Sequence, residues 1–445
     1  MKNKKKISLL LVAAFAILCF SSCSESNNGS GIGAGRTDTT NEPDNTDTSE
    51  LITSPATSSN QDIPSVNPTD GSIRLSFVAA GDNIIHESVF VDARNRAVAA
   101  ASTGAYSGNY YFDEMYAGVR DVISKADIAY INQEGPVAGD SLGVYGYPTF
   151  NAPEEIGDAL IRTGFDIINL ANNHMLDMDT RSRTGYAHTI EYWKTKNVMT
   201  IGAYENEEDY NTVRIYEKDG IKIAMLSYTY GTNGNSLSAA SPGLVIPYID
   251  DETISRHIAS AKTQADLVFV SMHWGTDTAG ASFNNTPTQE QRRLAQLTAD
   301  CGADVIIGMH PHVIQPVEWL TGSSGNKTLV TYSIGNFLST MLNSYNMLGG
   351  ILAFDIVKNT DGNITIENPE FLPMMCHYAA DPAVKDSQGY ATRSSVQLYM
   401  LENYTNELAM QHGTQLYGKF DLNTLYKYVT DTIDPMFLPE YIKNK

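Results

Sequence analysis

The sequence predicts a layered α/β fold, and three observations indicate it. The chain has 445 residues with 42% hydrophobic content, which is enough for one large or two medium domains with a proper core. From residue 72 onward, short apolar runs alternate with amphipathic stretches. The sequence shows no internal repeat, so a solenoid or other repeat array is not expected.

Each predicted element has a local signal. Short apolar runs bounded by turn residues favour buried strands, and longer stretches with helical periodicity favour helices. The last predicted helix has the clearest ends, because the Thr286 hydroxyl precedes a first-turn proline and Gly302 follows the final turn. We expect strands at 74–80, 128–132, 166–170, 221–228, 267–272, 304–308, 329–333 and 350–357, and helices at 153–163, 184–195, 251–265 and 287–301.

The start of the chain is typical of an export signal. Residues 1–6 contain four lysines, and residues 7–20 are apolar apart from one serine. The segment Phe20-Ser21-Ser22-Cys23 resembles the lipobox of bacterial lipoproteins, in which the cysteine is acylated. We therefore expect a signal peptide at 1–22, lipidation of Cys23 and attachment to the cell membrane on its extracytoplasmic face; an ordinary secretory peptide is the alternative.

Composition then divides the rest of the chain. Residues 23–70 are rich in Ser, Thr, Asn, Gly and Pro and contain no aromatic residue, which predicts a flexible tether. The strand and helix alternation extends over 71–380, which we predict to be one domain. It fades afterwards, and we predict a mainly helical extension at 381–445.

Charge and cysteine content exclude two classes of function. Lys plus Arg number 30 against 51 for Asp plus Glu, and this net charge of −21 argues against nucleic acid as a partner. The four cysteines are too few and too scattered for a thiolate zinc cluster. Any metal is therefore expected on His and oxygen ligands.

Polar clusters follow five of the predicted strands. The carboxyl ends of strands in an α/β sheet are where ligands bind, so these clusters are expected to converge. Imidazole with oxygen ligands fits two divalent ions, with Mn, Fe or Zn favoured over Ca or Mg. The clusters are Gly81-Asp82-Asn83 with His86, Asn132-Gln133-Glu134, Asn172-Asn173-His174 with Asp177, Ser271-Met272-His273, and His310-Pro311-His312.

In this order the motifs resemble the capsule-synthesis CapA family, whose PGA_cap domain belongs to the calcineurin-like metallophosphoesterase superfamily. Further shared elements are Phe150-Asn151-Ala152-Pro153, His273-Trp274-Gly275 and Ser333-Ile334-Gly335-Asn336-Phe337. The resemblance implies a metallophosphoesterase-like β-sheet sandwich flanked by helices. It implies Asp82, Glu134, Asn173, His273, His310 and His312 as metal ligands, with Glu134 as the bridging carboxylate. His174 and Asp177 are the catalytic candidates, and His86, Asn132 and Asn336 are possible metal or cleft residues.

The resulting expectation is a lipid-anchored protein of capsule or poly-γ-glutamate biogenesis that hydrolyses a phosphoester or amide bond with a metal-activated water. Its possible partners are the capsule polymer or the subunits of a polymer synthase. A non-catalytic assembly factor and an extracellular solute-binding lipoprotein are the alternatives.

Other residues have a simpler interpretation. We expect structural roles for His188, His257, His377 and His412, because none of them follows a strand-end motif. Six tyrosines gather in two predicted loops, at positions 106, 110, 111, 116, 145 and 147. They either pack in the core or the loops, or form an aromatic rim over the substrate.

Overall fold

The computed structural model of the protein describes residues 71–180, 183–277 and 283–443. The predicted export signal, Cys23 and the predicted tether lie outside the described residues. Within the described part, the helices are too short or too polar to cross a membrane.

The described chain alternates strands and helices, as the sequence predicts. The strands are β1 (Ile73–Ile84), β2 (Ile128–Glu134), β3 (Ile167–Asn169), β4 (Met199–Ile201), β5 (Arg214–Lys218), β6 (Ile221–Thr229), β7 (Leu267–His273), β8 (Val305–Met309), β9 (Val317–Thr321), β10 (Lys327–Thr331), β11 (Asn336–Leu338), β12 (Leu348–Lys358), β13 (Ile364–Lys385) and β14 (Ala391–Met400). The helices are α1 (Glu87–Ser102), α2 (Arg120–Ser124), α3 (Glu155–Thr163), α4 (Gly185–Lys194), α5 (Glu207–Asn211), α6 (Asp251–Ala261), α7 (Gln289–Asp300), α8 (Ser344–Met347), α9 (Asn406–Gln411), α10 (Leu422–Thr430) and α11 (Glu440–Lys443). Short 3₁₀ helices lie at η1 (Asp113–Tyr116), η2 (Asp140–Leu142), η3 (Leu401–Asn403), η4 (Gly413–Leu416) and η5 (Pro435–Phe437).

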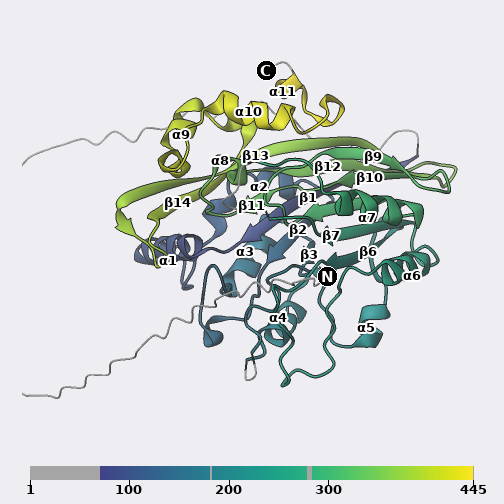
Figure 1. Ribbon diagram of the computed structural model, residues 1–445, viewed down its shortest axis with the longest axis horizontal. Helices are drawn as coiled ribbons and strands as arrows, with labels where there is room; N and C mark the ends of the chain where they lie inside the picture. The colour runs from purple at the N-terminus through teal and green to yellow at the C-terminus, as the bar shows by residue number, and fades with distance from the viewer. Residues whose placement is uncertain (1–70, 181–182, 278–282, 444–445) are drawn as a thin grey trace, which may run out of the picture. The chain divides into compact units, whose positions relative to one another are not determined.

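Two β-sheets form the centre of this structure (Figure 1). The eight-stranded sheet has the order β14-β13-β12-β1-β2-β3-β4, with β11 paired to the end of β1. Its strands β1 to β4 are parallel, whereas β12, β13 and β14 are antiparallel additions. The six-stranded sheet has the order β5-β6-β7-β8-β10-β9, with parallel central strands and antiparallel edges.

The two sheets share one hydrophobic core. Phe77 of β1 lies between Phe269 of β7 and Phe354 of β12, with ring centroids 5.2 and 4.9 Å apart. Successive side chains of a strand point to opposite faces, so in β7 Phe269 faces this shared core while Val268 and Val270 face α6 and α7. The predicted α/β class, with two sheets flanked by helices, is confirmed.

The predicted strands and helices all correspond to observed ones, with ends shifted by a few residues. One cap differs from the prediction. Helix α7 begins after Thr288, whose hydroxyl accepts the Gln291 N–H while the Gln291 side chain accepts the Thr288 N–H, forming a capping box. Thr286 is exposed, and Pro287 precedes the helix. Thr288 is the cap because the capping box pairs a free N–H group of the first turn.

The predicted helical extension from residue 381 needs a correction. Strand β13 continues to Lys385, and residues 391–400 form β14, so the helical part begins only after Met400. The register shifts after His377 and Asp381 are β-bulges or irregularities, which break the two-residue periodicity by which a strand is recognised. The helices that follow pack on β13.

Candidate metal centre

The five predicted clusters converge where strands of the two sheets end. Asp82 lies near the end of β1, Glu134 ends β2, and His273 ends β7. The loops after β3 and β8 supply the remaining residues. The His310 backbone N–H donates to Asp82 Oδ2 over 3.2 Å, so the two sheets are joined directly at the site.

Asp82, Glu134 and His312 form the tightest group. All three are buried, and each offers a ligand atom within 4.8 Å of the others. His312 Nδ1 lies 3.2 Å from Asp82 Oδ2, and His312 Nε2 lies 3.7 Å from Glu134 Oε1. Two carboxylates and one imidazole at this spacing form a suitable donor set for a divalent cation.

Glu134 provides the clearest test of whether a metal fits. Its side chain is buried, and neither of its carboxylate oxygens has a hydrogen-bond partner among the described residues. Burial raises the pKa of Glu134 well above its usual range, although the neighbouring His312 opposes this shift. A buried carboxylate whose oxygens accept no hydrogen bond is costly, and a bound cation offsets that cost, so the donor set fits a metal ion.

Asn173, His273 and His310 form a second group beside the first. Asn173 Oδ1 lies 2.9 Å from His273 Nε2, and the rings of His273 and His310 are 4.9 Å apart. Nδ1 of each histidine is buried and has no hydrogen-bond partner in the described structure. Burial lowers the pKa of both histidines well below the usual value, which favours the neutral imidazole that binds metals.

The His310-Pro311-His312 segment has an unusual backbone. His310 has a φ of 97° and His312 a φ of 57°, values that non-glycine residues rarely adopt. Such strain persists only where the surrounding structure holds it, and it concentrates at functional sites. Here it places both imidazoles in the site, with ring centroids 5.6 Å apart.

Asn132 and Asn336 support ligand residues. Asn132 Nδ2 donates to Asp82 Oδ1 over 2.7 Å, and Asn336 Oδ1 lies 2.9 Å from His312 Nδ1. His86 Nδ1 accepts the Thr340 N–H over 3.3 Å, and its ring lines a cavity beside the site. The structure therefore places His86 in the wall of the cleft.

His174 and Asp177 form a hydrogen-bonded pair. His174 Nδ1 lies 2.6 Å from Asp177 Oδ2, and His174 Nε2 lies 4.0 Å from Glu134 Oε1. Asp177 Oδ2 also accepts the Phe150 N–H, and the Phe150 ring packs edge-on against the imidazole at 4.7 Å. The pair thus directs Nε2 toward Glu134, one of the candidate metal ligands, and Asp177 positions the imidazole.

Sequence reasoning missed two residues in the loop after β6. Asn233 Oδ1 accepts from Asn173 Nδ2 over 3.2 Å, and the Tyr230 ring lies 4.5 Å from that of His310. Thr229-Tyr230-Gly231-Thr232-Asn233 directly follows a predicted strand, so the signal that identified the other clusters was present here too.

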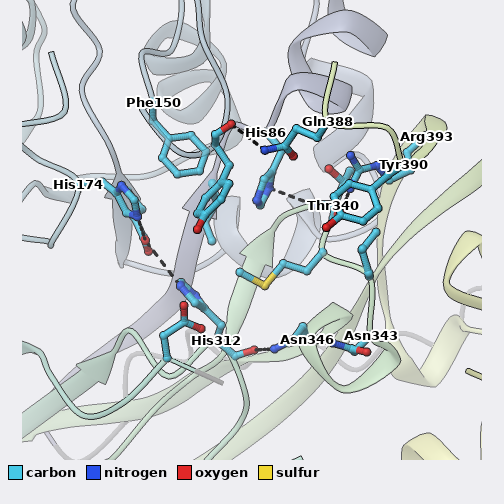
Figure 2. A pocket seen from close by; sticks show the side chains of 16 residues that line it. His86, Phe150, His174, His312, Thr340, Asn343, Asn346, Gln388, Tyr390 and Arg393 are labelled. Carbon is cyan, nitrogen blue, oxygen red and sulfur yellow. Dashed lines mark hydrogen bonds and ion pairs between the residues drawn. The ribbon is translucent and has the colours of Figure 1, made fainter. Parts of the chain in front are cut away.

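A cavity of about 290 Å³ opens beside the metal centre. Figure 2 shows His174 and His312 on one side of it and Gln388, Tyr390 and Arg393 on the other. The last three residues belong to the turn between β13 and β14 and to β14 itself. No motif in the sequence pointed to them.

Comparison with protein families identifies the family of the chain. Residues 76–341 match the family described as bacterial capsule synthesis protein PGA_cap, and the chain belongs to this family. The PGA biosynthesis protein CapA of Bacillus subtilis (strain 168) is 33% identical over 227 residues, and the capsule biosynthesis protein CapA of Bacillus anthracis is 30% identical over 238 residues. These matches cover 50% and 52% of this chain and 54% of each relative, so the chain spans about half the length of the curated relatives it matches.

Two solved structures show more distant similarity. The Haemophilus influenzae NAD nucleotidase has 12% identity and a TM-score of 0.41, covering 73% of this chain and 54% of that one. A putative 5′-nucleotidase from Staphylococcus aureus has 14% identity and a TM-score of 0.39, covering 71% and 56%.

Proposed function

We propose that this member of the capsule-synthesis family is a divalent-metal-dependent hydrolase of capsule biogenesis. One observation carries the proposal: Glu134 is buried beside Asp82 and His312, and neither of its oxygens accepts a hydrogen bond from the described residues. These three residues would hold one ion. Asn173, His273 and His310 would hold a second, and Glu134 would bridge the two.

The donor set favours Mn, Fe or Zn, because it combines several imidazoles with carboxylate and amide oxygens. Such ions, when bound, supply a nucleophilic water at neutral pH and neutralise charge on the reacting group. His174 then delivers a proton from Nε2 to the leaving atom, while Asp177 holds the proton on Nδ1. The bond cleaved is a phosphoester, whose leaving atom is oxygen, or an amide of the capsule polymer, whose leaving atom is nitrogen.

A metal-binding measurement tests the donor set. Glu134→Gln removes the charge of the side chain but keeps its shape. We expect the Mn²⁺ affinity, measured by calorimetry, to fall at least tenfold, which is the lower end of the loss of affinity found when groups at a metal site are mutated. Glu217→Gln is the matched control, because Glu217 is exposed on edge strand β5. Equal Mn²⁺ affinity in the wild type and Glu134→Gln would overturn the site.

Turnover separates the hydrolase from an assembly factor. The Mn²⁺-loaded protein is tested on a generic phosphodiester and on poly-γ-glutamate, together with His174→Ala. The hydrolase requires metal-dependent turnover of one of them, lost in His174→Ala. A protein that binds Mn²⁺ but turns over neither is better described as a scaffold for polymer synthesis or export.

We also propose that the protein is anchored by lipid at Cys23 on the extracytoplasmic face of the cell membrane, near the polymer and its synthase subunits. The lysine-rich start, the apolar run and the lipobox-like segment support this location. Incorporation of a labelled fatty acid is expected in the wild type and lost in Cys23→Ala. Equal labelling of both proteins would reject the anchor.

A further inference from the structure

The cavity beside the metal centre has a wall that the family match does not include. Residues 386–390 form the turn between β13 and β14, beyond the matched residues 76–341. Asp386 Oδ1 accepts the N–H groups of Gln388 and Tyr390 over 3.0 and 2.9 Å, and Gly389 has a φ of 83°. The turn is therefore held in one defined conformation.

Two adjacent residues attach this turn to neighbouring parts of the domain. Ser387 donates to the Glu87 carboxylate at the start of α1, and Gln388 Nε2 donates to the Tyr147 carbonyl over 3.0 Å. Figure 2 shows Gln388 joined in this way above His86. Tyr147 and Tyr390 consequently both line the same cavity.

The charge of the lining limits what can enter. Arg393 is the one Lys or Arg that lines the cavity among the described residues. Its guanidinium pairs with Asp386 and also donates to Ser88 Oγ and the Thr340 carbonyl, so its charge is already offset. Glu134 and Asp277 add carboxylates. Apart from the metal centre, the cavity lacks the free cationic groups that a polyanionic chain requires.

The remaining lining combines aliphatic side chains, such as Ile84, Met341 and Leu342, with aromatic rings and amides. Tyr147 and Tyr390 are 57% and 42% exposed, and the amides of Asn343 and Gln388 line the same cavity. Aromatic faces pack against the C–H faces of a sugar ring, and amides donate to and accept from hydroxyl groups. A volume of about 290 Å³ lies at the small end of ligand pockets and suits a single ring.

We propose that this cavity binds the neutral sugar ring of a sugar phosphate whose phosphate group lies at the metal centre, and that it disfavours a γ-linked glutamate chain. The inference rests on the proposed function, because the phosphate needs the bound metal. The β13–β14 turn is then a specificity element, with Tyr147 and Tyr390 as the residues that hold the ring.

Calorimetry on the Mn²⁺-loaded full chain tests the assignment with four probes: inorganic phosphate, glucose 1-phosphate, AMP and a γ-linked glutamate trimer. Glucose 1-phosphate is expected to bind at least tenfold more tightly than phosphate or the trimer. Equal binding of phosphate and glucose 1-phosphate, or equally tight binding of the trimer, would overturn the proposal. Tighter binding of AMP would overturn the single-ring assignment.

Variants locate the effect in the cavity. Tyr147→Ala combined with Tyr390→Ala should reduce glucose 1-phosphate affinity to about that of phosphate while phosphate affinity stays unchanged. Tyr417→Ala is the matched control, because Tyr417 is also 41% exposed but lies outside the cavity. Unchanged sugar phosphate affinity in the double variant contradicts the inference alone. Failure to take up Mn²⁺ contradicts the proposed function, and the inference falls with it.

Discussion

At the residue scale, the orientation of one imidazole connects the metal centre to the proposed chemistry. Asp177 accepts from His174 Nδ1, and the same carboxylate accepts the Phe150 N–H. This arrangement keeps a proton on Nδ1 and points Nε2 toward Glu134. Nε2 is then the ring atom that gains or loses a proton. The Phe150 ring excludes water from one edge of the imidazole.

Asp177→Asn tests this positioning role. An asparagine presenting its amide N–H to Nδ1 stabilises the wrong tautomer, so we expect kcat for a phosphodiester to fall by about 10²-fold or more. Mn²⁺ affinity should change little, because Asp177 does not belong to the ligand groups. Steady-state kinetics and calorimetry on the same preparation check both points. A parallel loss of Mn²⁺ affinity would instead indicate collapse of the site.

Of the four histidines expected to be structural, His257, His377 and His412 make hydrogen bonds away from the site, and His188 is exposed. His257 Nδ1 lies 3.0 Å from the Tyr228 hydroxyl, and His377 Nδ1 lies 2.8 Å from the Tyr404 hydroxyl. His412 Nε2 lies 3.0 Å from the Cys376 carbonyl, and its Nδ1 accepts the Thr414 N–H. The absence of a strand-end motif was sufficient to distinguish these residues from the candidate ligands.

His412 makes stability depend on pH. Burial lowers its pKa to about 3, so the unfolded chain takes up a proton below about pH 6.5 while the folded chain does not. Its contribution is therefore complete above about pH 6.5 and is lost as the pH falls toward 3. We expect His412→Asn, whose side-chain oxygen can still accept the Thr414 N–H, to reduce the slope of unfolding free energy between pH 6 and 4 by about 1 kcal/mol per pH unit.

Urea denaturation at several pH values measures this slope. The exposed His188→Asn is the control, and its slope should match that of the wild type. A slope in His412→Asn equal to that of the wild type would show that another group carries the pH dependence.

At the element scale, local sequence signals predicted the central elements well and the peripheral ones poorly. The strands β2, β7 and β8 are buried along their whole length, so their apolar runs are continuous and easily recognised. By contrast, β13 contains prolines and bulges, and polar residues such as Arg393 interrupt the apolar pattern of β14. Their strand pairing is decided by long-range contacts that no local window contains.

The start of α7 provides an element-scale test. Thr288→Ala removes one half of the capping box and leaves a helical N–H without its partner, so we expect a loss of about 1 kcal/mol in unfolding free energy. Thr286→Ala is the matched control, because Thr286 is exposed and makes no cap, and its effect should stay below about 0.5 kcal/mol. Chemical denaturation compares the two. A larger loss of unfolding free energy for Thr286→Ala than for Thr288→Ala would show that Thr286 caps the helix, as the sequence predicts.

At the scale of the whole molecule, the site depends on parts of the chain that are far apart. The three closest candidate ligands, Asp82, Glu134 and His312, come from both sheets, and the cavity beside them is completed by β14. The convergence of the five clusters could be predicted from the rule for strand ends. The contribution of Gln388, Tyr390 and Arg393 could not, because it follows from the pairing of β14 with β13.

The C-terminal helices belong to the same cooperative unit. Leu401, Leu425, Val429 and Ile442 are all buried in the core shared by the two sheets. Removing residues 401–445 uncovers the part of β13 that η3, η4 and η5 contact, and each lost large apolar side chain costs about 2–5 kcal/mol. For the four named side chains that sum is about 8–20 kcal/mol, as large as the 5–15 kcal/mol stability of a typical domain, so we expect the truncated chain to lack a cooperative unfolding transition.

A single core substitution tests the same prediction in a chain that still folds. Leu425→Ala should still fold, with unfolding free energy lowered by about 2–5 kcal/mol and Mn²⁺ affinity unchanged, because Leu425 lies in the core and away from the ligand groups. Thermal unfolding followed by circular dichroism, with Mn²⁺ calorimetry on the folded variants, provides both measurements. A truncated chain that unfolds cooperatively and binds Mn²⁺ like the wild type would show that the helices are an appended layer. The β13–β14 wall of the cavity would then be stable without them.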